Sequence, residues 1–133
     1  MCKYEKKVIK VAEKAPAAVG PYSLGVKASH FFFSAGQLGI NPSTGKFVEG
    51  GIQGQTRQAL KNLQAVLATA DLDLLQVVKV TVFLKDINDF SSMNRNSKSF
   101  SFSWRIPDLM TAFSITIKNK SCFFCFFNYF FSS

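Results

Sequence analysis

The clearest pattern in the chain is a helical repeat of apolar residues between Ile52 and Ala70. Apolar residues that recur every three or four positions lie on one side of an α-helix, and the Gln, Arg and Lys residues between them lie on the other. The apolar positions are Ile52, Ala59, Leu60, Leu63, Val66, Leu67 and Ala70. This spacing predicts an amphipathic helix that covers a core.

Stretches rich in β-branched and aromatic residues precede this helix. Lys7–Val11 alternates weakly, as an edge strand does, and Val26–Gln37 holds three consecutive phenylalanines before it stops at Gly36. The turn-forming residues Asn41–Gly45 then separate this run from Lys46–Val48. The pattern predicts an edge strand followed by a β-hairpin.

A strand and the start of a second helix follow the long helix. Val77–Leu84 alternates aliphatic residues with Lys79 and Thr81, which predicts a strand buried on one face. Asp86–Asp89 supplies caps for a helix that begins at Phe90. This order of strand, hairpin, helix, strand and helix predicts an α+β fold in which the helices cover one face of a sheet.

Length and composition are those of one globular domain. The chain has 133 residues and a mass of 14.8 kDa, which fits a single domain over residues 1–133. Apolar residues make up 47% and charged residues 18%, which excludes intrinsic disorder. The net charge of +8 permits anionic ligands, nucleic acid or a membrane surface as partners and selects none of them.

The composition changes abruptly after Asn94. Residues 95–133 hold nine of the 15 phenylalanines, and five basic residues against the single acidic Asp108. No strand-like or helix-like apolar period runs through them, so we expect this Phe- and Ser-rich tail to be divergent, and irregular or incomplete as part of the fold. A break at one point favours a changed reading frame, a retained intron or an alternative last exon as its origin.

Cysteine usage and hydropathy indicate the compartment. Cys2, Cys122 and Cys125 make an odd set, and no secretory signal pattern opens the chain, so we expect a cytoplasmic protein. The aromatic run from Cys122 to Phe131 is well short of the ~20 residues that a membrane-spanning helix needs. We therefore expect no membrane span.

Simple chemical motifs are weak in this sequence. His30 is the only histidine, and Cys122 and Cys125 have no second Cys or His pair, so no metal site is predicted. The glycines at 50, 51 and 54 lack the Lys-Ser/Thr ending of a phosphate-binding loop. Basic and aromatic residues in the tail leave nucleic acid open as a partner, but no RNA-binding module pattern supports it.

Two short strings carry more specific chemistry. Gly20–Ser23 places a rigid turn before Tyr22, whose phenol can donate or accept a hydrogen bond. Ser34–Gln37 ends a strand at Gly36, where a ligand can approach the backbone. Taken singly, each string is an ordinary loop or strand end.

Together with two further strings they resemble one family. The four strings are APAAVGPYS, SAGQLGINPSTGKFVEGG, QTRQALKNLQAVL and VVKVTVFLKDINDFSSMN. Their order and spacing over residues 8–94 are similar to those of the RidA, or YjgF, family of reactive-intermediate imine deaminases. The resemblance implies a chorismate-mutase-like α+β fold, assembly into a homotrimer if the tail permits it, and ligand clefts between neighbouring subunits.

The resemblance also implies an activity. Members hydrolyse 2-imino acids or their enamine tautomers, such as 2-iminobutanoate and 2-iminopropanoate, to 2-oxo acids and ammonia. A bidentate Arg suits the carboxylate of such a small substrate, and a carboxyl group suits the attacking water. No cofactor or metal is expected, because the imine carbon is already electrophilic.

The family's binding residues map onto three positions of this chain. Its cleft Tyr falls on Tyr22, its strand-end Gly on Gly36, and the Asn after its aspartate-rich turn on Asn94. The family's Ser falls on Ala35, with Ser34 one place early and therefore expected to face the other way.

The family's Arg and Glu have no counterpart at their positions. After Asn94 we expect neither the rest of the second helix nor the Pro-Ala-Arg motif and the following strand. Asp108 stands near the Arg position, Arg105 is the nearest arginine, and no Glu follows Glu49. The catalytic residues are therefore unassigned, and whether the chain is an enzyme stays open.

Two alternatives to an imine deaminase follow from these departures. One is a non-catalytic RidA-like protein that binds a small ligand or a partner. The other is an RNA-binding protein or endoribonuclease that inhibits translation, with which the net charge of +8 is compatible.

Overall fold

The computed structural model describes residues 5–77, 79–98 and 112–117, and side chains up to residue 97 within them. In chain order the elements are β1 (Lys6–Ile9), β2 (Gly25–Ala28), β3 (Phe31–Ser34), α1 (Gly51–Ala68), the 3₁₀ turn η1 (Leu74–Gln76), β4 (Lys79–Leu84), the 3₁₀ turn η2 (Ile87–Asp89), α2 (Phe90–Lys98) and β5 (Ala112–Ile117).

The first three strands form an antiparallel sheet in the order β1-β2-β3, so the predicted first strand stands at the end of this order. Val8 pairs with Val26, and Val26 with Phe33. The run Val26–Gln37, expected to pair with Lys46–Val48 as one arm of a hairpin, is itself divided into β2 and β3. The chain reverses at Ser29, whose φ of 54° is a turn conformation, and residues on the two sides of this turn pair with each other.

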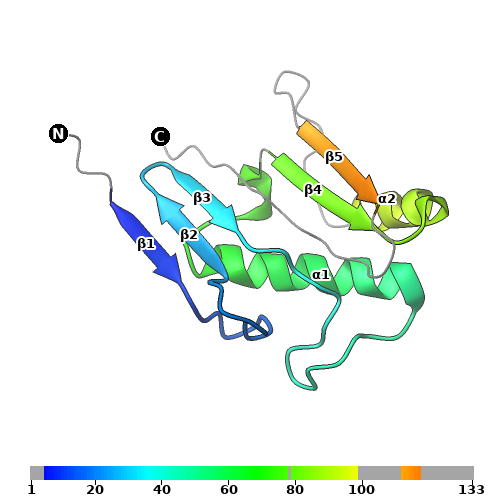
Figure 1. Ribbon diagram of the computed structural model, residues 1–133, viewed down its shortest axis with the longest axis horizontal. Helices are drawn as coiled ribbons and strands as arrows, with labels where there is room; N and C mark the ends of the chain where they lie inside the picture. Colours follow the sequence, from blue (N-terminus) through cyan, green and yellow to red (C-terminus); the bar gives the residue numbers. More distant parts are fainter. Residues whose placement is uncertain (1–4, 78, 99–111, 118–133) are drawn as a thin grey trace.

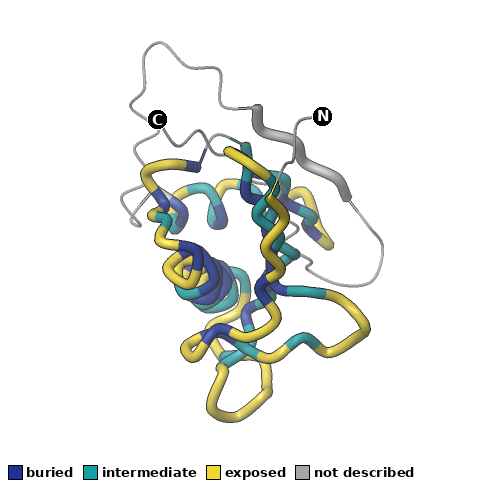
Figure 2. Tube along the Cα trace, turned by 90° about the vertical axis from the view of Figure 1, so that its left-hand side faces the viewer, coloured by how far each residue is buried: buried dark blue, intermediate teal, exposed yellow. Residues whose placement is uncertain are grey.

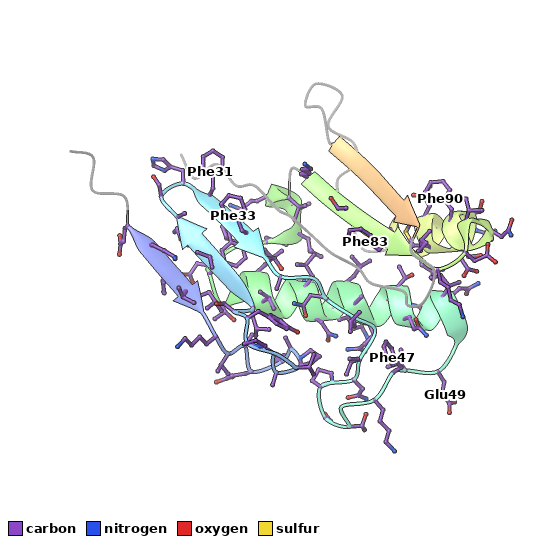
Figure 3. All side chains as sticks on the ribbon, viewed as in Figure 1. Phe31, Phe33, Phe47, Glu49, Phe83 and Phe90 are labelled. Carbon is purple, nitrogen blue, oxygen red and sulfur yellow. The ribbon has the colours of Figure 1, made fainter. Side chains whose placement is uncertain are left out.

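The turn predicted after β3 is confirmed, but the segments on its two sides pair less extensively than the predicted hairpin requires. The backbone N–H of Gly45 donates to the carbonyl of Asn41 at 2.9 Å, and that of Ser43 donates to Asn41 Oδ1 at 2.9 Å. Across the turn the strand pairing is one isolated bridge between Ile40 and Phe47. Figure 3 shows Phe47 beyond this turn, on the segment that leads into α1.

The predicted long helix is confirmed as α1. It begins after Gly50, which has a φ of 95° and gives no side-chain cap, and it ends at Ala68. Figure 2 shows α1 nearly end-on, with its buried side turned toward the strands. Its fully buried residues share one core with Phe32 of β3 and with Val80, Val82 and Leu84 of β4. The predicted alternation of β4 is therefore confirmed.

Asp86 forms a cap, as predicted, but it caps the 3₁₀ turn η2 that directly precedes the second helix. Asp86 Oδ1 accepts a hydrogen bond from the backbone N–H of Asn88 at 2.9 Å, and α2 follows at Phe90. The expectation that this helix would break off after Asn94 is wrong, because α2 continues to Lys98.

A strand also follows where none was expected. β5 runs parallel to β4, with Lys79 opposite Ala112 and Leu84 opposite Ile117. Parallel strands need a crossover, and α2 lies within the connection between them. The remaining tail residues to which sequence reasoning gave a role, Arg105, Asp108, Cys122 and Cys125, lie outside the described residues.

The layers of the molecule are those of the predicted α+β fold. Figure 1 shows α1 running along both the β1-β2-β3 sheet and the β4-β5 pair, with α2 at one end of it. α1 contacts β3 and α2, and the core lies between this helix and the strands. The end of β3 and the loop that leads into β2 are therefore held by the same sheet, which packs on α1.

We predict that the α1 core contact dominates stability. Leu63 is fully buried, and truncation to alanine leaves a cavity, so Leu63→Ala should lower the free energy of unfolding by about 2–5 kcal/mol. The exposed neighbour offers the control, since Gln64→Ala should change it by less than about 0.5 kcal/mol. Urea denaturation measures both. Equal effects of the two substitutions would contradict this packing.

Candidate functional site

A pocket of about 230 Å³ lies between the loop that leads into β2 and the segment that follows β3. The two segments supply every lining residue: Pro16, Ala17, Val19, Tyr22, Leu24, Gly36, Gln37, Leu38, Ile40, Pro42 and Gly45. Tyr22 and Gly36, which sequence reasoning selected separately, therefore line the same pocket.

Tyr22 is held in place by its own loop. The backbone N–H of Tyr22 donates to the carbonyl of Gly20 at 2.8 Å, and that of Val19 donates to Tyr22 Oη at 3.3 Å. Because Oη accepts this bond, its own proton remains able to donate to a ligand. The ring is 49% exposed, which leaves the phenol accessible at the pocket.

The segment that follows β3, from Gly36 to Ile40, forms the wall of the pocket opposite Tyr22. Gln37 is 4% exposed and its Nε2 donates to the carbonyl of Ala35 at 3.3 Å. Ser34 Oγ donates to the same carbonyl at 2.8 Å, and Ser34 is absent from the pocket lining. Ala35, the position of the family's Ser, is likewise absent from the lining, so the orientation expected for the Ser34 hydroxyl stays a prediction.

The wall lies directly against α1 at Gly39. A Cβ atom added there would come within 2.5 Å of the Cα of Gln55, closer than folded proteins allow. Glycine is therefore required if the backbone is to approach the helix this closely. On the other side the backbone N–H of Val48 donates to the carbonyl of Gly39 at 2.9 Å.

Asn94 stands elsewhere. It is half-buried on α2, next to the buried Met93, and does not line the pocket. Figure 1 shows α2 at the far end of α1 from β1 and β2. A hydrogen bond of 3.1 Å from Arg57 to Asn96 Oδ1 ties α2 to α1 there. Within one chain, the structure brings together two of the three expected binding residues.

The chemistry of the pocket is that of a small, mostly apolar ligand site. Among the described residues that line it, none carries a charge, and the side-chain polar groups are the Tyr22 hydroxyl and the Gln37 amide. Sequence reasoning missed the aliphatic lining from Leu24, Leu38 and Ile40. The sequence did offer a signal for this lining, because the three residues lie within or beside the two strings that contain Tyr22 and Gly36.

The other sequence candidates do not form sites in the described part of the chain. His30 is exposed at the turn between β2 and β3. No group of three His, Cys, Asp or Glu residues that could hold a metal ion occurs among the described residues. Nor does any helix within them combine the length and hydropathy needed to span a bilayer.

Comparison with known proteins identifies relatives of this chain. Residues 12–111 match the family model described as Endoribonuclease L-PSP. A RutC family protein of Pyrococcus horikoshii is 54% identical over 82 residues, which are 62% of this chain and 65% of that protein. A 2-iminobutanoate/2-iminopropanoate deaminase of Mus musculus is 45% identical over 102 residues, 77% of this chain and 74% of that protein.

Solved structures agree with these sequence matches. A structure from Thermotoga maritima, described as a putative endoribonuclease, superposes with a TM-score of 0.82 at 30% identity over 96% of this chain and 99% of that one. The E. coli TdcF structure, which has bound serine, gives 0.79 at 28% identity over 96% and 100%. The YjgF gene product of E. coli gives 0.76 at 30% identity over 92% and 96%. By sequence and by fold, this chain belongs to the RidA, or YjgF, family.

Proposed function

We propose that this protein is a 2-iminobutanoate/2-iminopropanoate deaminase that binds its substrate in the pocket between Tyr22 and Gly36. The observation that carries the proposal is that these two residues, selected for the family's cleft, line one pocket. Relatives named for this activity are 44–45% identical to the chain. We place the activity in the cytoplasm, as the cysteine content suggests.

The reaction adds water across the C=N bond of the 2-imino acid. The water oxygen bonds to the imine carbon, the nitrogen takes a proton, and collapse of the carbinolamine releases ammonia and leaves the 2-oxo acid. The electrophilic carbon is already present in the substrate, so this hydrolysis uses no metal or organic cofactor. The protein's part is to hold the substrate and to position the water.

The pocket has groups for the first of these tasks. Leu24, Leu38 and Ile40 offer apolar surface to the short alkyl chain of the substrate. The hydroxyl of Tyr22 can donate a hydrogen bond to a polar atom of the ligand. The Gln37 amide offers a second polar group on the opposite wall. The TdcF structure with bound serine supports a ligand of this size and kind.

The carboxylate of the substrate needs a cation, and the described residues of the pocket lining include none. We propose that a neighbouring subunit supplies it, because the family resemblance places the clefts between subunits of a homotrimer. In such an assembly Asn94 reaches the site from a different chain than Tyr22 and Gly36. This accounts for its position on α2, outside the pocket.

We predict suppression of imine trapping by the purified protein. An amino acid oxidase or dehydratase generates 2-iminobutanoate, and semicarbazide traps what is not hydrolysed. The protein should lower the yield of trapped imine in proportion to its concentration, while heat-denatured protein should not.

Two other outcomes would replace this proposal. Binding of 2-oxobutanoate without any suppression would make the protein a non-catalytic ligand-binding member of the family. Binding of RNA that weakens steeply with salt, with no effect on trapping, would favour the nucleic acid alternative.

Tyr22 provides a direct test of the pocket. Tyr22→Phe removes the hydroxyl and keeps the ring, so the dissociation constant of 2-oxobutanoate should rise about 2- to 10-fold, as the loss of one hydrogen bond predicts. Tyr22 is half exposed, so the unfolding midpoint should change little. Isothermal titration measures the binding. Unchanged affinity would exclude the phenol from the site.

The outer face of the β1-β2-β3 sheet supports the proposed assembly. Val8, Val26 and Phe33 form one cross-strand row, while the neighbouring Phe32 points into the core that α1 covers. Side chains alternate between the faces of a strand, so this row lies on the face away from α1. An apolar sheet face of this kind suits contact with further copies of the chain.

We predict a mass in solution of three times 14.8 kDa. Val26→Asp places a charge on the apolar row and should shift the species toward monomer, as light scattering after gel filtration would show. Gln64→Asp, on the exposed side of α1, is the control and should leave the mass unchanged. A monomeric starting protein would contradict the assembly.

A further inference from the structure

One buried amide on α1 holds the wall of the pocket. Asn62 is fully buried, and its Nδ2 donates to the carbonyl of Leu38 at 2.9 Å and to that of Ile40 at 2.8 Å. Its Oδ1 accepts from Gln58 Nε2 at 2.9 Å. Both donors and an acceptor site of this side chain are thus used, which is what a fully buried amide requires.

The two carbonyls that Asn62 binds flank the closest contact between the wall and the helix. Between them lies Gly39, which touches the backbone of α1 at Gln55 and whose own carbonyl accepts from Val48 on the opposite side. Successive carbonyls of this segment therefore point alternately toward α1 and toward Val48. The segment is fixed from both sides, and on the helix side Asn62 donates a side-chain hydrogen bond to each of the two carbonyls.

Asn62 does not line the pocket, but the residues it binds do. Leu38 and Ile40 belong to the wall that faces Tyr22, together with Gly36. A carbonyl fixed by a hydrogen bond also fixes the orientation of its peptide plane, and hence the direction of the side chains on either side.

We propose that Asn62 is a positioning residue for the ligand, acting through the carbonyls of Leu38 and Ile40. This inference rests on the proposed function, because it takes the pocket as the substrate site. In the absence of Asn62, the two carbonyls lose their partners next to an apolar core, and the wall must shift to find others. Ligand affinity then falls by more than the loss of global stability explains.

The test compares two substitutions at neighbouring buried positions of α1. Asn62→Leu removes both hydrogen bonds to the wall and keeps a similar volume, whereas Leu63→Ala opens a cavity in the core and leaves both of these hydrogen bonds in place. Binding of 2-oxobutanoate is measured by titration at a temperature where both variants are fully folded by circular dichroism. Asn62→Leu should raise the dissociation constant at least about tenfold, and Leu63→Ala should leave it within about twofold of the original.

A third substitution distinguishes the two bonds from Asn62 to the wall from its bond to Gln58. Gln58→Met removes the bond to Asn62 Oδ1 and leaves both bonds to the wall in place. Its affinity should stay close to that of the original protein. Equal affinities for Asn62→Leu and Leu63→Ala would overturn the positioning role and leave Asn62 as a structural tie alone.

A ligand-free measurement keeps the two proposals distinguishable. If the original protein fails to bind 2-oxobutanoate, the proposed substrate class fails. Amide chemical shifts of ¹⁵N-labelled, ligand-free protein then decide the inference. In Asn62→Leu the largest changes should fall on residues 36–41 and on Val48, and in Leu63→Ala they should not. Shifts at the wall that match those of Leu63→Ala would overturn the inference.

Discussion

The candidate site depends on how closely the segment after β3 approaches α1. Gly39 lies so near the helix backbone that a Cβ atom would meet the Cα of Gln55 at 2.5 Å. Asn62 fastens the carbonyls on both sides of Gly39 to the same helix. The helix is itself anchored by its apolar side, where Leu60 and Leu63 lie in the core with Phe32. The pocket wall is thus fixed to a helix that is itself packed in the core. A loop fixed in this way can position the residues of a binding site.

The pocket that results is neutral, and this shapes the functional account. In the part of the chain that the structure describes, its lining offers apolar surface, the phenol of Tyr22 and the amide of Gln37, but no cation for a carboxylate. The proposed homotrimer, in which a neighbouring chain would complete the cleft, would reconcile this lining with the activity for which the relatives are named. It also gives a role to the apolar row of Val8, Val26 and Phe33 on the outer sheet face.

Much of the fold follows from local pattern in the sequence. The helical repeat of α1 and the alternation of β4 appear in the sequence because each element buries one side, and its periodicity sets which residues share that side. The Asp86 cap is a bond between residues only two apart in the chain. The reversal at Ser29 was missed because Val26–Gln37 has no Gly or Pro where the chain turns. The continuation of α2 was missed because no apolar residue follows Met93 in this helix. β5 was missed although Phe113, Ile115 and Ile117 alternate with Ser114 and Thr116, because this short alternation is surrounded by sequence without an apolar period.

The site was predictable only in part, and for a similar reason. The strings around Tyr22 and Gly36 gave those two residues, but not that Leu38 and Ile40 would complete the same pocket. Nor did they show that Asn62, whose place in the sequence is an ordinary position of an amphipathic helix, would donate hydrogen bonds to that wall. Asn62 and the wall are more than twenty residues apart in the chain. Contacts between distant segments leave little trace in local spacing.

The most direct test of the central claim is to map 2-oxobutanoate on the ¹⁵N-labelled protein by NMR. The account predicts that the amide signals of Tyr22 and residues 36–40 shift together and saturate with one dissociation constant. Shifts confined to other surfaces, such as the groove lined by Lys14 and Lys61 on the exposed side of α1, would contradict it.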